Sequence, residues 1–395
     1  MSFFFFKNKP SLSFIFDIRD SSISLAVARF ELDKKPEMIL CQNFAFKYLD
    51  SKNHEKYLSS MLKTIDIANI SIRKKLVKMG NSEKIDKHYF FIGSPWSVSQ
   101  SKTIKIVKDK QFEVNNAVLK KIIVGEELSA EKHLESETLE PKWKVLEERI
   151  IQSKLNGYKV DDIFGKKASS LAIELFVSFI PNQIEEKLSS LVKNKIGKYT
   201  EKQNNSCILS SYSFLRDLYL DKNDFIYVDI GKLITDVYVV RDDIIFGVAS
   251  IPFGEENIIQ TSLAKTNLSK DVFLSHLSIG HDKKFDLPSH NSVEDLLKSG
   301  FDMWEGKLKN SLSKICTEMN IPSNMFIVRN GTVLNMIVKK IIDNKQFEIM
   351  GSKIEITFIL ENIINGYIKN ANTISNEPYI KMDLVFLDKI LKGKQ

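Results

Sequence analysis

A segment near the middle of the chain, residues 225–254, combines residue types that can hold a phosphate and a metal ion. Its sequence, FIYVDIGKLITDVYVVRDDIIFGVASIPFG, predicts a buried strand, a tight turn and two further strands. The candidate binding positions are Asp229, Gly231, Thr235, Asp236 and Gly254. Amides at a glycine turn can hold a phosphate through their N–H groups, and carboxylates can hold a metal ion. An ordinary β-meander with acidic turns is the alternative interpretation.

A second acid-tipped hairpin lies near the N-terminus. Phe14–Asp17 predicts a short apolar strand that ends in an aspartate, and the strand pattern resumes over Ile23–Phe30. The candidate residues of this hairpin are Asp17, Arg19, Ser21 and Ser22. Two such strand–aspartate–turn–strand units, far apart in one chain, indicate a duplicated α/β architecture with a cleft between its halves.

The order of these parts resembles the actin-like ATPase superfamily, which includes actin, Hsp70 and the sugar kinases. In that fold a ribonuclease H-like α/β domain is duplicated, and a hairpin from each half closes on the phosphates of ATP. The opening MSFFFFKNKPSLSFIFDIRDSSISLAVARF is similar to the start of PilM-type pilus proteins. The segments HYFFIGSPWSVSQSKTIKI and IIQSKLNGYKVDDIFGKKASSLAIELFVSFI resemble the inserted α+β subdomain (SHS2 domain) of the cell-division protein FtsA. The resemblance spans most of residues 11–340.

The resemblance implies four parts. Residues 1–84 would form the first actin-like subdomain, and residues 85–197 the inserted α+β subdomain of the FtsA/PilM group. Residues 198–378 would form the second actin-like half, which carries the second phosphate loop and the adenosine loop. Residues 379–395 would be an amphipathic C-terminal tail.

The resemblance also assigns roles to the candidate residues. Asp17 and Asp229 would face Mg²⁺ through water, and Thr235 would lie near the β- and γ-phosphates of ATP. Asn330 and Gly331 stand at the turn where the family contacts adenosine.

Several positions depart from the family pattern. The first loop carries Arg19 and Asp20 where the family has glycine and a hydroxyl residue. Arg19 could still contact a phosphate, whereas Asp20 would bring a negative charge toward the γ-phosphate. Lys232 replaces a small residue in the second loop, and Asn330 replaces one glycine of a pair. ATP and Mg²⁺ therefore stay candidate ligands, but efficient turnover is not expected.

Two functions from different classes remain open. The first is a cytoplasmic scaffold of the FtsA/PilM type that binds ATP weakly or not at all, with a weak ATPase activity left open. It would organise a division or pilus assembly at the inner face of the cell membrane, through a membrane-anchored protein or its cytoplasmic peptide. The second is an ATP-dependent small-molecule kinase of the same superfamily. Phosphoryl transfer depends on intact phosphate loops, so the altered first loop and the inserted subdomain argue against the kinase.

Composition and charge limit the other classes of function. The 395 residues include 57 Lys+Arg and 50 Asp+Glu, a formal net charge of +7. The basic residues are scattered without an aromatic–basic repeat, which favours a solvated surface over nucleic-acid binding. Peripheral contact with an anionic membrane and self-association stay open.

The three cysteines, Cys41, Cys207 and Cys316, are isolated, which is typical of buried thiols in a reducing compartment. The apolar run Phe3–Phe6 is too short for a signal peptide.

Apolar periodicity predicts the remaining elements. Helices are expected over residues 58–76, 115–134, 183–195, 208–220, 255–263, 268–279, 293–319 and 333–342. Strands are expected over residues 39–46, 89–93, 144–155, 158–163 and 170–180, with a polar loop over residues 197–206. Asn115 is a candidate N-cap. For Tyr379–Leu391, a packed terminal helix is favoured over a membrane anchor.

Overall fold

Two units make up the structure, which is a computed structural model. Unit 1 comprises residues 1–218, 244–246 and 364–395, and unit 2 comprises residues 219–243 and 247–363. The described residues are 11–50, 52–81, 83–138, 142–196, 201–266, 268–279, 293–317, 320–328, 347–359, 361–375 and 377–393. The Phe3–Phe6 run and the expected helix over residues 333–342 lie outside them.

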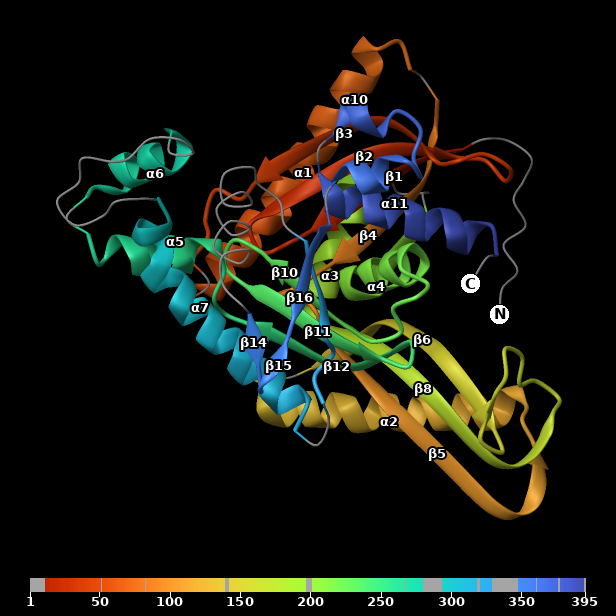
Figure 1. The fold of residues 1–395 in the computed structure, drawn as a ribbon. Coiled ribbons are helices and arrows are strands. Elements are labelled where there is room, and N and C mark those ends of the chain that lie inside the picture. Colours follow the sequence, from red (N-terminus) through yellow and green to blue (C-terminus); the bar gives the residue numbers. More distant parts are fainter. Residues whose placement is uncertain are drawn as a thin grey trace. The chain divides into compact units, whose positions relative to one another are not determined.

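A five-stranded sheet with the order β3-β2-β1-β4-β9 forms the centre of unit 1 (Figure 1). Its strands are β1 (Ser11–Ile18), β2 (Ser22–Phe30), β3 (Glu37–Ala45), β4 (Ile85–Ile92) and β9 (Glu201–Ser206). β1, β2 and β3 form an antiparallel meander, while β4 and β9 continue the sheet in parallel pairing. The apolar side chains of β1 and β2 are almost completely buried, which anchors the β1–β2 turn to a rigid core.

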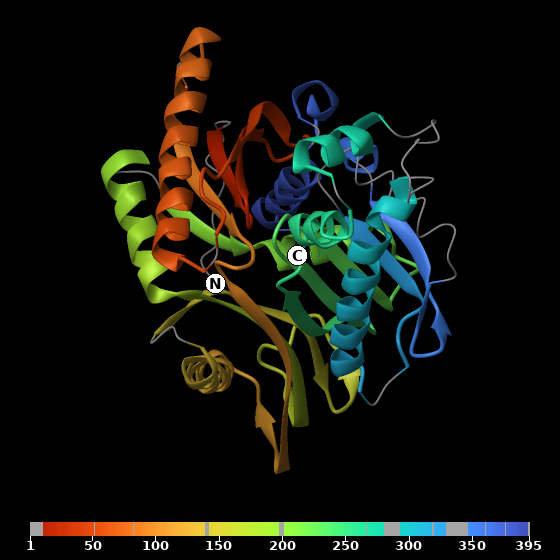
Figure 2. The same cartoon turned by 90° about the vertical axis from the view of Figure 1, so that its left-hand side faces the viewer.

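Helices cover both faces of this sheet. They are α1 (His54–Lys78), α3 (Asn182–Leu191), a π-helix (Val192–Ile196), α4 (Cys207–Leu218), α10 (Ala371–Ile374) and α11 (Pro378–Leu391). Arg73 of α1 lies over the ring of Phe14, 4.9 Å from its centroid, so α1 covers the Phe14 face. Strand alternation places Asp17 on the opposite face, where α11 and α4 pack. Figure 2 shows α1 and α11 on opposite sides of the sheet. The packed terminal helix predicted from the sequence is confirmed.

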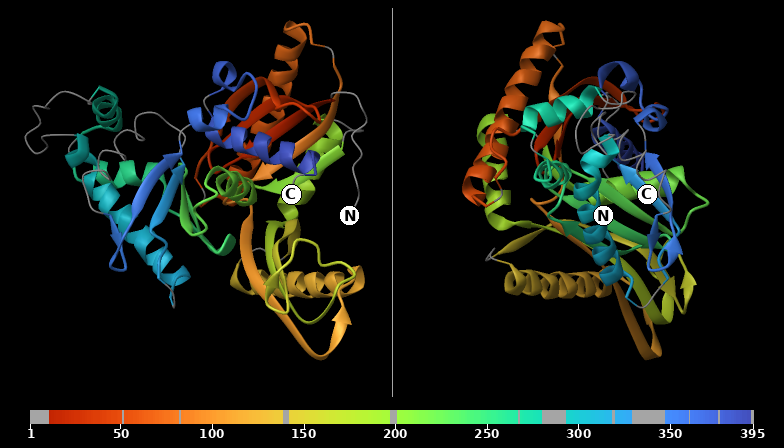
Figure 3. Two further views of the ribbon diagram at one scale, coloured as in Figure 1. Left: turned by 45° about the vertical axis from the view of Figure 1, so that its right-hand side comes forward. Right: turned by 60° about the vertical axis from the view of Figure 1, so that its left-hand side comes forward.

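The inserted part of unit 1 is a four-stranded antiparallel sheet with one helix across it (Figure 3). Its elements are β5 (Val98–Glu113), α2 (Asn116–Glu137), β6 (Trp143–Leu155), β7 (Tyr158–Lys159) and β8 (Lys167–Pro181), and the strand order is β5-β8-β6-β7. Leu119 and Ala130 of α2 pack on apolar residues of β8 and β6. The predicted N-cap is confirmed, because the side chain of Asn115 accepts a hydrogen bond from the N–H of Val118 at 3.0 Å.

A carboxyl pair between α2 and β6 makes this packing sensitive to pH. Burial is the main cause that raises the pKa of Glu127 to about 8, and a hydrogen bond with Glu148 adds to it. The native state therefore keeps a proton that the unfolded chain releases near pH 4.5, and stability falls as the pH rises toward about 8. We expect Glu127→Gln to unfold at a higher temperature than the wild type at about pH 8, with the two converging near pH 5. Glu126→Gln is the matched control. Because Glu126 forms an ion pair with Lys102, this variant should not unfold at a higher temperature than the wild type. Equal pH dependence of all three proteins in thermal scans would contradict this.

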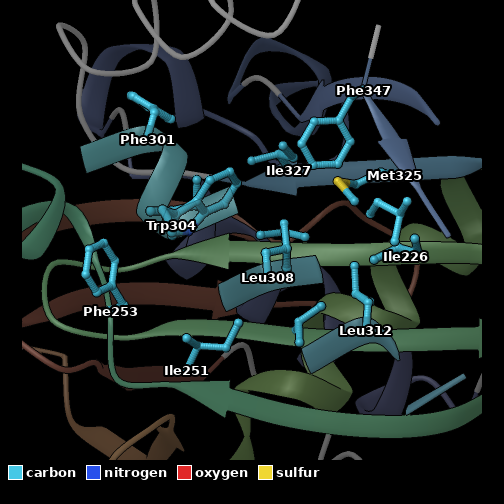
Figure 4. Packing of buried hydrophobic residues seen from close by; sticks show 14 of the residues in the cluster. Ile226, Ile251, Phe253, Phe301, Trp304, Leu308, Leu312, Met325, Ile327 and Phe347 are labelled. Carbon is cyan, nitrogen blue, oxygen red and sulfur yellow. The ribbon is translucent and has the colours of Figure 1, made fainter. Parts of the chain in front are cut away.

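Unit 2 contains a second five-stranded sheet, with the order β12-β11-β10-β13-β16. Its strands are β10 (Phe225–Ile230), β11 (Thr235–Arg241), β12 (Ile244–Ile251), β13 (Asn324–Val328) and β16 (Glu355–Ile359), beside the small hairpin β14 (Glu348–Ile349) and β15 (Ser352–Lys353). The helices that follow these strands are α5 (Glu255–Leu263), α6 (Lys270–Ile279), α7 (Val293–Ile315) and α9 (Glu361–Asn365). Figure 4 shows the core, where Phe301, Trp304, Leu308 and Leu312 of α7 pack on the sheet.

The two sheets repeat one topology. In each, three antiparallel strands form a meander, and two parallel strands extend it on the side of the first strand. This repetition confirms the duplicated α/β architecture that the two acid-tipped hairpins predicted.

Two predictions about local structure were wrong. The polar segment over residues 197–206 was expected to be a loop, but Glu201–Ser206 forms β9, and Asn205 is fully buried. Main-chain pairing with β4 stabilises this strand despite its polar side chains. The strand expected over residues 158–163 ends at Lys159, because Asp162 accepts a hydrogen bond from the N–H of Phe164 and forms a turn. Within the described residues, no helix is both long and apolar enough to cross a membrane.

Candidate functional site

The first candidate site is the turn between β1 and β2 in unit 1. The N–H of Arg19 donates to the carbonyl of Ser22 at 3.0 Å, and the carbonyl of Ser21 accepts from Phe46 at 2.8 Å. These bonds close the turn and tie it to the end of β3. Asp17, just before the turn, is only 1% exposed.

Arg19 is held on three sides. Its Nε donates to Oδ1 of Asp17 at 2.7 Å, and its guanidinium lies 4.0 Å from the ring centroid of Tyr379 on α11. Its carbonyl accepts a hydrogen bond from Nε1 of Trp96 at 2.8 Å. The cation of the first loop therefore neutralises the carboxylate of the same loop.

A second carboxyl lies close to this pair. Burial is the main cause that raises the pKa of Asp17, and the charge of Arg19 opposes it. Burial also raises the pKa of Asp383 on α11 well above its ordinary range, and the charge of Asp17 adds to that rise. Ser210 Oγ donates to Asp383 Oδ1 at 2.6 Å, and the Cys207 thiol donates to Asp17 Oδ1 at 3.6 Å. Arg19 thus hydrogen-bonds one of the two buried carboxyl groups, Asp17, and its charge also acts on the other, Asp383.

The second candidate site is the turn between β10 and β11 in unit 2. The N–H of Gly231 donates to the carbonyl of Ile234 at 2.8 Å, which closes the turn. Asp229 and Asp236 are paired directly across the two strands, and Asp229 is 6% exposed. Ser250 Oγ donates to Asp236 Oδ1 at 2.5 Å. One of the two acids is therefore already hydrogen-bonded to β12.

The side chain of Thr235, at the end of this turn, makes hydrogen bonds to two other segments of unit 2. Its hydroxyl is fully buried, donates to the carbonyl of Phe253 at 2.7 Å and accepts from Nε1 of Trp304 at 3.1 Å. The hydroxyl thus connects the hairpin to the α7 core.

The start of α5 is bound to the second turn. The N–H groups of Glu255 and Glu256 donate to the carbonyls of Gly231 and Lys232 at 2.9 and 2.8 Å. A Cβ on Gly254 would lie 2.6 Å from the carbonyl oxygen of Gly231. Glycine is therefore required here for the close approach of the turn, and these two helix amides are not free to hold an anion.

A different kind of site lies in unit 1, between α4, α11 and the middle of β6. A cavity of about 120 Å³ is lined by apolar side chains that include Leu209, Tyr212 and Phe386. Its cations are Arg149, Arg216 and Lys389. Lys389 contacts Asp217 at 2.6 Å and Ser213 at 2.8 Å. Burial is the main cause that lowers the pKa of Lys389, and Asp217 opposes it.

A larger cavity, of about 650 Å³, also has Lys389 in its lining. The loop between β2 and β3 lines it, together with Phe214 of α4 and Tyr367. The two cavities flank the C-terminal ends of α4 and α11, so a chain segment could cross from one to the other.

Comparisons with known proteins decide the fold. No protein-family model and no curated protein matches this sequence. An acetate kinase from Entamoeba histolytica matches 97% of this chain and 100% of its own chain, at 11% identity and a TM-score of 0.42. A Bacteroides thetaiotaomicron protein with an actin-like ATPase fold and unknown function matches 97% of this chain and 99% of its own chain, at 11% identity and a TM-score of 0.39. A PilM–PilN type IV pilus biogenesis complex matches 98% and 99%, at 11% identity and a TM-score of 0.60, and of these three it alone is close enough to establish the fold. The chain has an actin-like ATPase fold.

The structure brings the predicted residues of each actin-like loop together. Asp17, Arg19, Ser21 and Ser22 share the β1–β2 turn of unit 1. Asp229, Gly231, Thr235, Asp236 and Gly254 gather at the β10–β11 turn of unit 2. Asn330 and Gly331 lie outside the described residues. The nucleotide-binding role of all these positions stays a prediction.

Charged and donor groups of the two described loops are already bonded within the chain. Arg19 neutralises Asp17, and the amides of Glu255 and Glu256 are bonded to the adjacent turn. A nucleotide would have to displace contacts that the chain makes with itself.

Sequence reasoning missed the residues that complete the first loop. Asp383 was not among the candidate residues, yet it is 1% exposed beside Asp17. Cys207 was taken as an isolated thiol. Neither position carries a local signal, since only the fold brings α4 and α11 to the β1–β2 turn.

Proposed function

We propose that this chain is an actin-like scaffold of the PilM type, which holds a cytoplasmic peptide of a membrane-anchored assembly protein and binds ATP weakly or not at all. The full-length similarity to the PilM–PilN complex supports a pilus-type assembly over a division ring. The proposal places the protein in the cytoplasm, at the inner face of the membrane where such a partner is anchored.

The observation that carries the proposal is the ion pair between Arg19 and Asp17 in the first loop, at 2.7 Å. A phosphotransferase needs this loop to receive phosphate and metal charge, and positioning and charge compensation make up most of its catalysis. Here the loop is neutralised by its own side chain. A stable, nucleotide-independent platform suits this arrangement better than a kinase does.

The cavity beside α4 and α11 supports the peptide part of the proposal. Apolar side chains line it together with Arg149, Arg216 and Lys389, which supply positive charge. This combination complements a short peptide with apolar anchors and acidic neighbours. Arg216 is the most useful position to test, because its side chain is 35% exposed and its nearest acid, Asp217, is 3.9 Å away.

The test uses the cytoplasmic N-terminal peptide of a PilN-type protein from the same genome, carrying a fluorescent label. We expect saturable binding by fluorescence anisotropy and an at least tenfold weaker affinity for Arg216→Glu, since one charge-assisted contact is worth about 1.5–3 kcal/mol. Lys63→Glu on α1 makes the same charge change on an exposed helix outside the cavity and should bind like the wild type. Absence of wild-type binding, or an equal loss in both variants, would contradict the proposal.

Nucleotide binding is measured on the same protein by titrating labelled ATP with Mg²⁺. We expect no saturable binding at micromolar protein concentrations. Tight binding that Asp229→Ala abolishes would contradict the nucleotide-independent scaffold, and ADP release that depends on an added sugar or acetate would favour a kinase.

A further inference from the structure

One side of α2 is turned away from the inserted sheet (Figure 3). Leu119 and Ala130 are buried against β8 and β6, so the residues on the opposite side of the helix point outward. Some of these outward positions follow one another in alternate steps of four and three residues, a spacing typical of a helix face that packs along a second helix. We call this set the α2 stripe, and its members are Ala117, Lys121, Val124, Leu128, Glu131 and Glu135.

The centre of the α2 stripe is apolar and open to solvent. Val124 is 40% exposed, and Leu128, one turn further along the helix, is 52% exposed. Neither residue belongs to the two clusters of described residues that hold α2 on its sheet. A second surface could therefore bury both side chains without disturbing the packing of α2.

The charges of the α2 stripe are separated along the helix. Lys121 lies in its first half, whereas Glu131 and Glu135 lie in its second half. The dipole of a helix favours the reverse order near its ends, with acids first and bases last. Burial raises the pKa of Glu131, and the charge of Glu135, one turn away, adds to that rise. Within the described part of the chain, none of these three side chains forms an ion pair that would compensate this order of charges.

A glycine lies beside the α2 stripe. Gly125 follows Lys121 by four residues and precedes Leu128 by three, so it shares their side of the helix. Glycine weakens a helix interior compared with alanine. A Cβ added to Gly125 would meet no atom within 4 Å, so packing inside the chain does not require a glycine here. Glycine would instead allow another backbone to approach α2 closely at this point.

The α2 stripe is complementary to a reversed copy of itself. When two copies of a helix pack antiparallel, positions at equal distances on either side of a common midpoint lie opposite each other. With the midpoint at position 126, Val124 faces Leu128 of the second copy, and Lys121 faces Glu131 of the second copy. Gly125 is one residue from that midpoint, where two crossing helices come closest. The antiparallel arrangement also opposes the two helix dipoles.

We propose that two copies of this chain associate through an antiparallel pair of α2 helices related by a twofold axis. Each copy contributes the same stripe, so every ion pair and apolar contact occurs twice in one closed interface. A uniformly charged partner, such as a polyanion, would be attracted by one half of the stripe and repelled by the other. This contact is separate from the proposed peptide cavity at α4, α11 and the middle of β6.

Sedimentation velocity of the whole protein measures this association. One helix pair is a small interface, so we expect the monomer of 45.3 kDa to be in equilibrium with a dimer at micromolar concentrations. Lys121→Glu and Glu131→Lys should each weaken the dimer about tenfold, because each substitution places two pairs of like charges opposite each other. The double variant Lys121→Glu, Glu131→Lys restores opposite charges and should associate like the wild type.

Gly125→Gln separates a lost contact from a damaged fold. The new side chain should weaken the dimer, because it lies where the two backbones approach each other. The monomer should nevertheless unfold at a higher temperature, since the added Cβ meets nothing within the chain and glutamine favours a helix.

The matched control is Lys63→Glu, which makes the same charge change on the exposed side of α1 and should leave the dimer intact. A wild type that stays monomeric up to submillimolar concentrations would overturn the proposal. So would a dimer that both single charge variants leave unchanged, or a double variant that associates more weakly than either single one. Peptide anisotropy of Lys121→Glu should stay at the wild-type value, so this contact and the proposed scaffold function can fail independently.

Discussion

Arg19→Ala should lower the free energy of unfolding by about 3–5 kcal/mol, the usual cost of removing one partner from a buried ion pair. The substitution leaves the carboxylate of Asp17, which is 1% exposed, without its cation and next to Asp383. It also removes the guanidinium that lies over Tyr379 and connects α11 to the β1–β2 turn. Urea unfolding followed by circular dichroism measures the loss.

The pH dependence of this variant identifies the cause. Without Arg19, the pKa of Asp17 should rise further, because burial already raises it and the opposing charge is gone. The wild type and the variant then differ in bound protons only between the two native pKa values of Asp17. The stability deficit should therefore grow as the pH rises through the raised native pKa of Asp17 and vanish at lower pH, where both native states are protonated. A deficit that is constant with pH would mean that lost packing on Tyr379 dominates.

The double variant Arg19→Ala, Asp17→Asn serves as the control. Replacing both members of a buried ion pair by uncharged groups often changes the free energy of unfolding very little. Most of the stability lost in Arg19→Ala should therefore return. Additive losses in a double-mutant cycle would contradict the coupling between these two residues. An unchanged stability of Arg19→Ala, accompanied by weaker ATP binding, would instead assign Arg19 to nucleotide binding and count against the nucleotide-independent scaffold.

The sequence was sufficient for the local elements of the fold. The turn after Asp17, the turn after Asp229 and the helix that includes Trp304 follow from alternation, turn residues and helical periodicity, and all three lie where predicted. The repetition of the two hairpins also predicted the duplicated sheets. These features depend on short-range patterns, which one sequence contains in full.

Contacts between segments distant in the chain could not be predicted from the sequence. Nothing local in the segment Glu201–Ser206 indicates a strand, because its hydrogen bonds are supplied by β4, a partner distant in the chain. The spacing of Lys381 and Asp383 places them off the apolar stripe of α11, yet both are buried, since α11 is covered on more than one side. The contact of Arg19 with Asp17 was equally hidden, because an arginine in that turn could as well have pointed toward a phosphate.

Gly300→Ala should be the most damaging small substitution in unit 2, with a loss of about 3 kcal/mol, at the upper end of the usual range for overpacking. Gly300 lies where α7 crosses α5, and a Cβ there would be 2.1 Å from the carbonyl oxygen of Ile258 and 2.6 Å from Oγ of Ser262. The same Oγ accepts a hydrogen bond from the N–H of Gly300 at 3.0 Å. The backbone of α5 must therefore move to admit the methyl group.

Movement of α5 has a specific consequence for the second loop. The first amides of that helix, at Glu255 and Glu256, hold the carbonyls of Gly231 and Lys232. Hydrogen exchange of these two amides should therefore be faster in Gly300→Ala. The matched control is Gly306→Ala on the same helix, where a Cβ meets nothing within 4 Å and the better helix propensity of alanine should add about 0.5–1 kcal/mol. Similar stability of the two variants, or unchanged exchange at Glu255 and Glu256, would show that the α5–α7 crossing does not position the loop.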